Sequence, residues 1–476
     1  MDDRNLRLGG SLFTAIGDEI DGLRRGLTDL ATGMVRDRTR LAITGLRRSG
    51  KTVLTTCLAH HLLEPSGLPF LSVVAENRLD ATRLVPLRDL PPFPAEAAIA
   101  GLSAAEPVWP KPTDRLSGLS IEILYRTGNR IGRLIDPTRR HFIEIVDYPG
   151  EWLLDLPLLE HDFRTFSAQA MTLADRPIRQ PAAAGWRALL AGLDPTAPGD
   201  AALERRLADA YSTYLHTCQE EMGLSFIQPG RFVDRTRVLD EELVTFCPLP
   251  LASGPFPPGS IGARFEARFE RYRDEIVKEF YRSNFSRFDR QIVLVDLLTA
   301  LNRGPDHFID VQESIATVVR SFRYGSGSIL TNWLTPRIDR LVFAATKADH
   351  IAPSQHAAMK QLLEIMVAPS SRHTRFSGAP HEVLAVAALR STDVVRTELH
   401  GQVLSCLKGR LVETGQETVL FPGELPPDLP EPDDWNSGRF RFRDFAPRRL
   451  PRGRNGASSH IRLDQLLEAA IGDRLA

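Results

Sequence analysis

Cysteine is scarce in this chain, and its cysteines lie far apart. The four among 476 residues are Cys57, Cys218, Cys247 and Cys406, and they form no CxxC pair and no cluster with histidine. This spacing argues against a disulfide framework and against a structural zinc site. We therefore expect a protein of the reducing cytosol.

The chain also lacks an excess of charge of either sign and any long apolar run. Its 59 basic and 60 acidic residues give a formal net charge of −1, so no overall field attracts nucleic acid or an anionic membrane. No run approaches the roughly 20 apolar residues of a membrane-spanning helix, and residues 1–4 are unlike a signal peptide. We expect a cytoplasmic protein without a transmembrane segment, for which a peripheral membrane contact stays open.

The chain does have the composition of a folded protein and an alternation of strand and helix patterns. Hydrophobic residues make up 42% and charged residues 25%, and 476 residues exceed what one compact core usually accommodates. The alternation predicts an α/β fold with a mainly parallel sheet, helices on both faces and two or three domains. The strand patterns span residues 41–44, 70–75, 120–125, 141–146, 291–297, 341–345 and 383–387.

Helix patterns separate these strands, and one pair of strands is expected to be antiparallel. A hairpin at 119–147, with a turn near Gly128, Asn129 and Gly132, should form an antiparallel edge of the sheet. Residues 84–118 are rich in proline and are expected to be irregular. The helix patterns span residues 14–38, 53–63, 304–322, 353–367 and 462–474.

Composition and periodicity divide the chain into four segments. Residues 1–151 and 290–395 carry the α/β pattern and are expected to form one core. Residues 152–289 show helices broken by Pro/Gly-rich joints, which predicts an inserted helical domain. Residues 396–476 are expected to form a small accessory region that contains strands. Its strand-like runs span residues 403–407, 418–421 and 440–445.

The last helix of the insertion carries an aromatic stripe with charged residues behind it. Such a stripe can contact RNA or a membrane surface, but an apolar face with a charged back is usually a packing face. We expect packing. The stripe consists of Phe265, Phe269, Tyr272, Ile276 and Phe280.

The strongest chemical motif is a P-loop. Residues 45–52, with the sequence GLRRSGKT, match the pattern in full and lie between a strand and a helix pattern. Successive N–H groups of such a loop and the helix N-terminus face the anionic phosphate oxygens. Lys51 should reach the β- and γ-phosphates, and the hydroxyl of Thr52 should bind Mg²⁺; an ordinary glycine turn is the alternative. The candidate nucleotide-binding residues here are Gly45, Arg47, Arg48, Ser49, Gly50, Lys51, Thr52 and Val53.

A DxxG element follows the second strand of the hairpin, as Asp147-Tyr-Pro-Gly150. An aspartate at the carboxyl end of a strand beside a P-loop is placed to hold the magnesium shell, and a glycine N–H can sense the γ-phosphate. The pattern is also that of an ordinary turn, but its order after the P-loop favours the nucleotide interpretation. Thr113, just before the hairpin, is the candidate magnesium-binding threonine, with a Pro-rich linker as the alternative.

A third motif, Thr346-Lys347-Ala-Asp349, directly follows the strand pattern at 341–345. A carboxylate can accept from both guanine N1–H and the guanine N2 amine, whereas adenine offers neither donor there. Lys347 would lay its aliphatic stem along the base. After the next strand, the backbone N–H groups of Ala388 and Leu389 are candidates to approach guanine O6, although small residues here also suit packing.

These motifs occur in the order found in translation-factor-class P-loop GTPases. The P-loop, the DYPGEW segment, the large helical insertion and the TKAD motif together resemble the bacterial YcjX-like family over nearly the whole chain. The resemblance implies a Ras-like GTPase core with inserted and appended domains. It also implies guanine nucleotide as ligand and a stress-associated role.

The sequence departs from the usual GTPase pattern at three positions. Thr346 stands where asparagine is common, Ala387 where serine is usual, and Glu151 where many GTPases have the glutamine that orients the attacking water. Glutamate could orient water, act as a base or be catalytically silent. An arginine of the phosphate loop could supply positive charge in cis, so Arg48 joins Lys51 and Glu151 as a candidate catalytic residue.

Three functions are compatible with these motifs. The first is a switch that binds GTP or GDP with Mg²⁺, hydrolyses GTP slowly and reports its state to an unknown effector protein. The second is an ATPase or kinase on the same scaffold, which the TKAD motif opposes. The third is a nucleotide-bound interaction scaffold with negligible turnover.

Overall fold

The computed structural model describes most of the chain from the first core strand onward. The helix predicted over 14–38 falls almost entirely outside the described residues, as do Asn129 and Gly132 of the predicted turn. The described residues are 37–113, 115–128, 137–237, 240–250, 254–322, 338–376, 380–399, 402–451 and 459–476.

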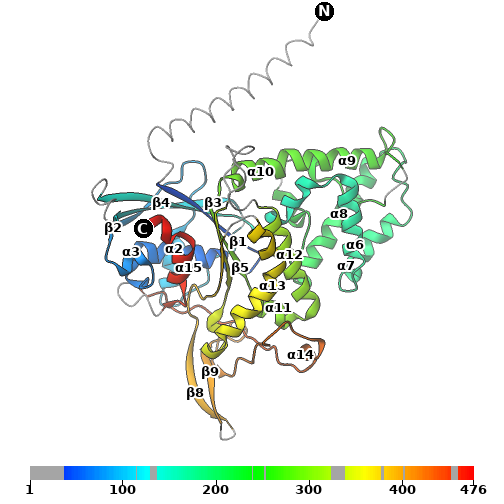
Figure 1. Cartoon of the computed structure of the whole chain (residues 1–476). Coiled ribbons are helices and arrows are strands. Elements are labelled where there is room, and N and C mark those ends of the chain that lie inside the picture. The colour runs from blue at the N-terminus through cyan, green and yellow to red at the C-terminus, as the bar shows by residue number, and fades with distance from the viewer. Residues whose placement is uncertain are drawn as a thin grey trace, which may run out of the picture.

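A seven-stranded sheet lies at the centre of the molecule, in the order β2-β3-β4-β1-β5-β6-β7 (Figure 1). Neighbouring strands from β4 to β7 pair in parallel, and β3 pairs antiparallel with both β2 and β4. The strands are β1 (Arg38–Gly45), β2 (Leu79–Val85), β3 (Ser117–Arg126), β4 (Thr138–Asp147), β5 (Arg290–Val295), β6 (Arg340–Ala345) and β7 (His381–Ala385). The mainly parallel α/β sheet predicted from the sequence is confirmed, and β5 and β6 lie side by side in it.

The predicted hairpin exists as β3 and β4, but it is not the edge of the sheet. β2 pairs along the outer side of β3; no strand was predicted at 79–85, and the last two of these residues begin the region 84–118 that was predicted to be irregular. That region also contains the helix α4 (Ala95–Ser103). The strand predicted at 70–75 is wrong, because residues Ser72–Ala75 form the short helix α3.

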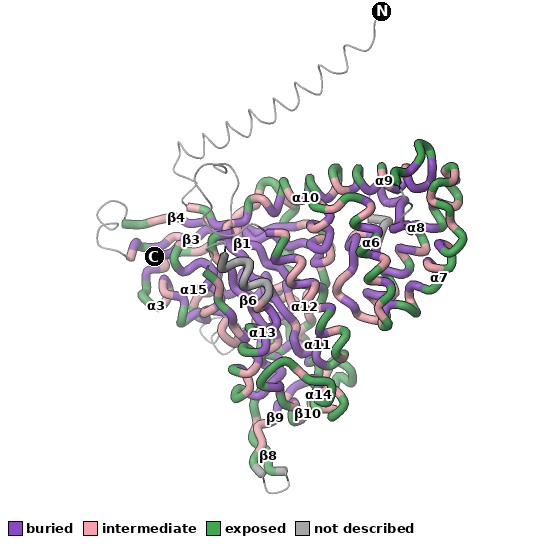
Figure 2. The backbone as a smooth tube through the Cα atoms, turned by 45° about the vertical axis from the view of Figure 1, so that its right-hand side comes forward, coloured by how far each residue is buried: buried purple, intermediate pink, exposed green. Residues whose placement is uncertain are grey.

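Each face of the sheet has its own hydrophobic core. Along β1, Leu41 and Ile43 point into one core and Ala42 into the other, as the two-residue period of a strand requires. Helices α2 (Lys51–Leu63), α4 and α15 (Leu463–Ile471) cover the first face. The opposite face is covered by α11 (Leu297–Arg303), α12 (Pro305–Arg320) and α13 (His356–Phe376). Figure 2 shows the resulting buried band through the centre of the molecule.

A helical insertion joins β4 to β5 and lies to one side of the sheet (Figure 1). Phe265, Phe269 and Tyr272 are fully buried and Phe280 is nearly so, which makes the aromatic stripe a packing face. The insertion contains the 3-10 helices η3 (Gly150–Glu160), η5 (Gly230–Arg237), η6 (Glu242–Val244) and η8 (Phe285–Arg287) and the π-helical turns η4 (Thr217–Glu221) and η7 (Tyr272–Val277). Its α-helices are α6 (Phe163–Ala174), α7 (Gln180–Leu190), α8 (Ala201–His216), α9 (Ile261–Arg271) and α10 (Lys278–Ser283).

The segment after β7 leaves the core and then returns to it. It first forms an antiparallel sheet of β8 (Thr392–Leu399), β9 (Gln402–Arg410) and β10 (Glu417–Leu420), followed by the short helix α14 (Pro432–Asn436). The strand predicted at 440–445 is absent, apart from one bridge between Leu411 and Phe445. Helix α15 then packs on the central sheet near β5 and β6. Among the described helices, none has both the length and the apolar character to cross a membrane.

Candidate functional site

The predicted phosphate loop connects β1 to α2. Gly45 ends β1, Lys51 begins α2, and Gly50 and Arg48 between them have left-handed φ angles of 93° and 65°. These angles turn the backbone around the space that precedes the helix N-terminus. The Nζ of Lys51 donates to the carbonyl oxygens of Gly45 at 2.9 Å and Leu46 at 3.3 Å.

The ammonium of Lys51 is buried in this loop. Burial lowers the pKa of Lys51, and the carboxylates of Glu151 and Asp147 oppose that shift. Neutral carbonyl oxygens are its hydrogen-bond acceptors here. An anionic phosphate oxygen would be a stronger partner, because a charge-assisted hydrogen bond is roughly twice as strong as a neutral one.

The two arginines of the loop are both exposed, but they differ in their contacts. The guanidinium of Arg47 forms an ion pair with Glu220 and donates to Gln219 at 3.3 Å. Both partners belong to the helical insertion. The charge of Arg48 acts instead towards Asp444, a residue of the C-terminal region.

Ser49 and Val53 complete the predicted loop residues. The Oγ of Ser49 is buried and has no hydrogen-bond partner among the described residues, although the Ser49 N–H donates to the carbonyl oxygen of Leu46 at 3.2 Å. A Cβ on Gly45 would lie 2.3 Å from this hydroxyl and 3.2 Å from the carbonyl oxygen of Leu294, so a larger residue here would displace the Ser49 side chain. Val53 is half-buried in the first turn of α2.

Three predicted magnesium-binding residues meet at the start of α2. The hydroxyl oxygens of Thr52 and Thr113 lie 2.9 Å apart, and the Thr113 hydroxyl donates to the carboxylate of Asp147. Burial raises the pKa of Asp147, against the opposing effects of Thr113 and Lys51. A helix, a loop and a strand end thus deliver three oxygen donors to one place.

This donor set fits Mg²⁺. Magnesium prefers carboxylate, hydroxyl and water oxygens and is usually bound by one or two protein groups together with substrate phosphates. Thr52, Thr113 and Asp147 offer such oxygens beside the phosphate loop. Across the described ranges, no group of three or more His, Cys, Asp or Glu residues is placed to hold a metal ion.

The glycine of the DxxG element touches the phosphate loop directly. A Cβ on Gly150 would lie 2.4 Å from the carbonyl oxygen of Gly45 and 2.6 Å from the Nζ of Lys51. Glu151 follows and is half-buried. A Cβ on Gly230 of the insertion would in turn lie 2.0 Å from the carbonyl oxygen of Glu151. The segment that follows Asp147 is therefore packed between the phosphate loop and the insertion.

One buried carboxylate fixes this segment to the insertion. Asp155 in η3 accepts from the N–H of Gly230 at 2.6 Å and from the hydroxyl of Tyr272 at 2.7 Å. Burial raises the pKa of Asp155 to about 6, although Arg231 and these hydrogen bonds act in the opposite direction. No sequence pattern singled out this residue.

The TKAD motif lies at the same edge of the sheet as the phosphate loop. β1, β5 and β6 are adjacent and parallel, so their carboxyl ends lie together. The N–H of Thr346 donates to the carbonyl oxygen of Val295 at 3.0 Å, and its hydroxyl donates to the same oxygen at 3.4 Å. The threonine therefore ties the motif to the end of β5.

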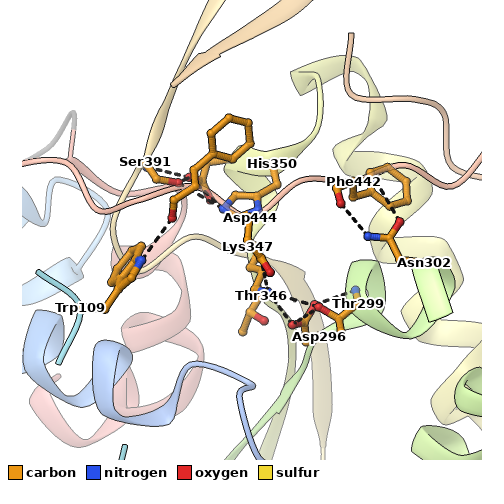
Figure 3. Close-up of polar contacts among 12 residues, drawn as sticks. Trp109, Asp296, Thr299, Asn302, Thr346, Lys347, His350, Ser391, Phe442 and Asp444 are labelled. Atoms are coloured by element: carbon orange, nitrogen blue, oxygen red, sulfur yellow. Dashed lines mark hydrogen bonds and ion pairs between the residues drawn. The ribbon is translucent and has the colours of Figure 1, made fainter. Parts of the chain in front are cut away.

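Lys347 is held by two carboxylates (Figure 3). Its Nζ lies 2.8 Å from Asp296 and 2.8 Å from Asp444, and 3.3 Å from the hydroxyl of Thr299. Burial alone would lower the pKa of Lys347, but the two carboxylates outweigh it and raise the pKa. Asp296 and Asp444 were not identified from the sequence, because neither lies in a recognisable motif.

Asp349 is buried and oriented by a serine from another segment. One of its carboxylate oxygens accepts from the N–H of Ser391 at 2.7 Å and from the Ser391 hydroxyl at 2.5 Å. The sequence pointed to a missing serine at position 387. The structure places a serine hydroxyl against Asp349 four residues later, from Ser391 at the end of the connection to β8.

The predicted O6 contacts lie in the turn after β7. The N–H of Ala348 donates to the carbonyl oxygen of Val386, which places this turn against the TKAD loop. Ala387 exchanges backbone hydrogen bonds with Ile461, whereas Ala388 and Leu389 lie in the turn that follows. A cavity beside Asp349 is lined by residues that include Phe70, Ile351, His356, Arg390 and Thr392.

Comparison with known proteins identifies close relatives of the whole chain. The profile of the YcjX-like family, DUF463, matches residues 39–475. The chain is similar to the "Ras-like GTPase YcjX" of Escherichia coli K12, with 37% identity over 470 residues that cover 95% of this chain and 99% of the relative. It is also similar to the "Ras-like GTPase YcjX" of Shewanella oneidensis MR-1, with 35% identity over 463 residues that cover 92% of this chain and 94% of the relative.

Proposed function

The chain belongs to the YcjX-like family, and from this premise we propose that it binds GTP with Mg²⁺ and hydrolyses it slowly as a conformational switch. Its relatives carry the name Ras-like GTPase, which supports a guanine nucleotide as ligand. The division into a core of 1–151 and 290–395, a helical insertion of 152–289 and an accessory region of 396–476 is part of the proposal.

The meeting of Thr52, Thr113 and Asp147 beside Lys51 is the observation that carries this proposal. The N–H groups of the loop and the ammonium of Lys51 would bind the phosphates, and the three oxygen donors would hold Mg²⁺ directly or through water. Held by these residues, Mg²⁺ would supply positive charge against the negative charge that develops during phosphoryl transfer.

Hydrolysis needs a positioned water and positive charge near the γ-phosphate. We assign the positioning of water to Glu151, because Gly150 before it already lies against Lys51. Arg47 is committed to Glu220 of the insertion, which makes Arg48 the better candidate to supply charge in cis.

Base recognition is assigned to the TKAD loop. The carboxylate of Asp349 would accept from guanine N1–H and N2, with Ser391 fixing its orientation. The N–H groups of Ala388 and Leu389 would face O6. A carboxylate in this role discriminates against adenine because adenine presents no matching donors.

The switch would reach the insertion through two contacts of the phosphate site. Arg47 of the phosphate loop is paired with Glu220, and Glu151 is packed against Gly230. A change around the γ-phosphate would therefore alter how the insertion packs against the core, and an effector protein would recognise the altered arrangement.

Nucleotide titrations test the proposal. We expect GTP and GDP to bind more tightly than ATP, and chelation of Mg²⁺ to weaken GTP binding. Single-turnover assays should show slow GTP hydrolysis that Glu151→Ala decreases further. Equal affinity for ATP would revive the ATPase alternative, and the absence of any hydrolysis in the wild type would favour a nucleotide-bound scaffold.

A further inference from the structure

A segment of the C-terminal region crosses the loop that carries the TKAD motif. We call residues 440–446 the C-terminal arm. The arm is fixed to the small sheet by its backbone, because the N–H of Val412 donates to the carbonyl oxygen of Asp444 at 3.0 Å and the N–H of Ala446 donates to the carbonyl oxygen of Arg410 at 2.7 Å. The ring of Phe445 fills the space over Gly409, where a Cβ would lie 2.7 Å from it.

The arm is also bound to α11, one of the helices that cover the central sheet. The amide of Asn302 in α11 donates to the carbonyl oxygen of Phe442 at 2.6 Å and accepts from the Phe442 N–H at 3.0 Å (Figure 3). One side chain thus satisfies both backbone groups of one residue. The path of the arm over the core is therefore specified by hydrogen bonds on both sides of Asp444.

At the centre of the arm, Asp444 reaches Lys347. The carboxylate lies 2.8 Å from the Lys347 ammonium, whose other carboxylate partner is Asp296. Lys347 and, more weakly, Arg48 of the phosphate loop lower the pKa of Asp444, although burial acts in the opposite direction. Asp444 therefore lies where the charges of both loops act on it.

The next residue of the arm contacts the segment that leads to Thr113. The indole N–H of Trp109 donates to the carbonyl oxygen of Phe445 at 3.2 Å (Figure 3). The ring of Phe445 also lies edge-on to the ring of His350, with 5.1 Å between the two centroids. Asp444 and Phe445 thus both contact the loop that carries the TKAD motif, and Phe445 also contacts the segment that precedes Thr113.

We propose that the C-terminal arm completes the nucleotide site, with Asp444 as a positioning residue for Lys347 and Phe445 as the link to Trp109. This inference rests on the proposed guanine-nucleotide function. The Asp444 carboxylate holds the Lys347 ammonium so that its stem stays in line with the base. When binding of the base shifts the Lys347 side chain, the arm transmits this shift to Trp109 and the segment before Thr113.

The test compares Asp444→Asn with the wild type in binding of mant-GDP and in Trp109 emission. The asparagine variant should bind about three- to fivefold more weakly, the size expected for loss of a partly exposed ion pair. The change in tryptophan emission on adding unlabelled GDP should shrink to the level of Trp109→Phe. Asp444→Glu should restore part of both responses.

Glu413→Gln is the matched control. Like Asp444→Asn, this change removes one carboxylate that forms an ion pair near the arm. The Glu413 carboxylate lies 3.0 Å from the guanidinium of Arg443, and this pair is exposed. It should leave affinity and emission unchanged. If Asp444→Asn binds and responds like the wild type, the arm has no part in the site. If the wild type itself does not bind guanine nucleotide, the proposed function fails and this inference fails with it.

Discussion

The phosphate end and the base end of the proposed site are built in different ways. At the phosphate end, the principal groups come from the continuous stretch 45–151, and most of them lie in two motifs. At the base end, Lys347 and Asp349 are oriented by Asp296, Ser391 and Asp444, which come from three separate segments.

The phosphate end is therefore encoded by local motifs, whereas the base end is assembled from segments that the fold brings together. A phosphate loop creates its own site, because its backbone N–H groups and helix N-terminus act wherever the loop folds. The base loop instead depends on neighbours that the chain order does not reveal. Substitutions in distant segments should therefore disturb base recognition more than phosphate binding.

Lys51→Ala is the most severe way to break the phosphate end. It should reduce GTP affinity by about a hundredfold or more, because it removes a buried charge that would lie among several phosphate oxygens. Calorimetric titration with GTP measures the loss. Lys360→Ala, which removes an exposed lysine paired with Glu364, should bind normally. Unchanged binding by a folded Lys51→Ala protein would remove the phosphate-loop assignment.

Asp349→Asn is the matching change at the base end. It should move preference from GTP towards XTP and cost GTP about 2–3 kcal/mol, or roughly two decades, because an amide pairs with the xanthine carbonyl oxygen. The asparagine oxygen can still accept from Ser391, so the loop should keep its shape. Competition between GTP and XTP measures the shift.

The control for this variant is Asp393→Asn, which breaks only an exposed pair with Arg448. It should keep the preference of the wild type for GTP. A folded Asp349→Asn protein that also keeps this preference would show that the base is recognised elsewhere.

Asp155 offers a pH-dependent test of how firmly the phosphate end is tied to the insertion. Its folded-state pKa of about 6 lies above the value of about 3.9 expected in the unfolded chain. The folded state then binds more protons between these values, so this group's contribution to the free energy of unfolding is greatest below pH 4 and falls as pH rises to 6. The total loss should be about 2–3 kcal/mol.

Chemical denaturation at pH 4, 5, 6 and 7 measures this dependence. The difference between wild type and Asp155→Asn should change with pH in the stated direction, because asparagine does not titrate. Asp194→Asn, at an exposed turn of the insertion, should show no such decline with rising pH. A difference that is constant over this range would contradict the assignment.

Thr113→Val should give the smallest effect and should depend on magnesium. Loss of one hydroxyl from the metal shell should weaken GTP binding in Mg²⁺ by about three- to tenfold, the size of one net hydrogen bond. With EDTA present, the variant and the wild type should bind alike. Thr113→Ser keeps the hydroxyl and should behave as the wild type. An equal loss with and without Mg²⁺ would assign Thr113 to packing.

The central sheet was predictable because its buried strands have strong local patterns. β5 and β6 are fully apolar runs at their centres, and each is followed by a motif or a helix. β2 was missed because it is a half-exposed edge strand whose sequence, LDATRLV, mixes charged and apolar residues without clear alternation. Edge strands are specified by pairing more than by composition.

Local pattern also failed where distant residues decide the conformation. Residues 70–75 look like a strand, but the N–H and hydroxyl of Ser72 are bound by Glu468 at 2.9 and 2.7 Å, which caps the short helix α3. In the site, Thr113 could be proposed from its position before the hairpin. Asp444 could not, because nothing in the sequence indicates that the arm crosses Lys347.

The return of α15 to the central sheet has a consequence for synthesis of the protein. Asp464 binds the N–H of Phe70 across 394 residues of chain, so α15 can cover its part of the apolar face only after the insertion and the arm have been made. At about 5–20 residues per second, the ribosome needs about 20–80 s to cover that distance. During this time the apolar surface of β1 and α2 that α15 later covers stays exposed, and exposed apolar surface of this kind favours aggregation of a nascent chain.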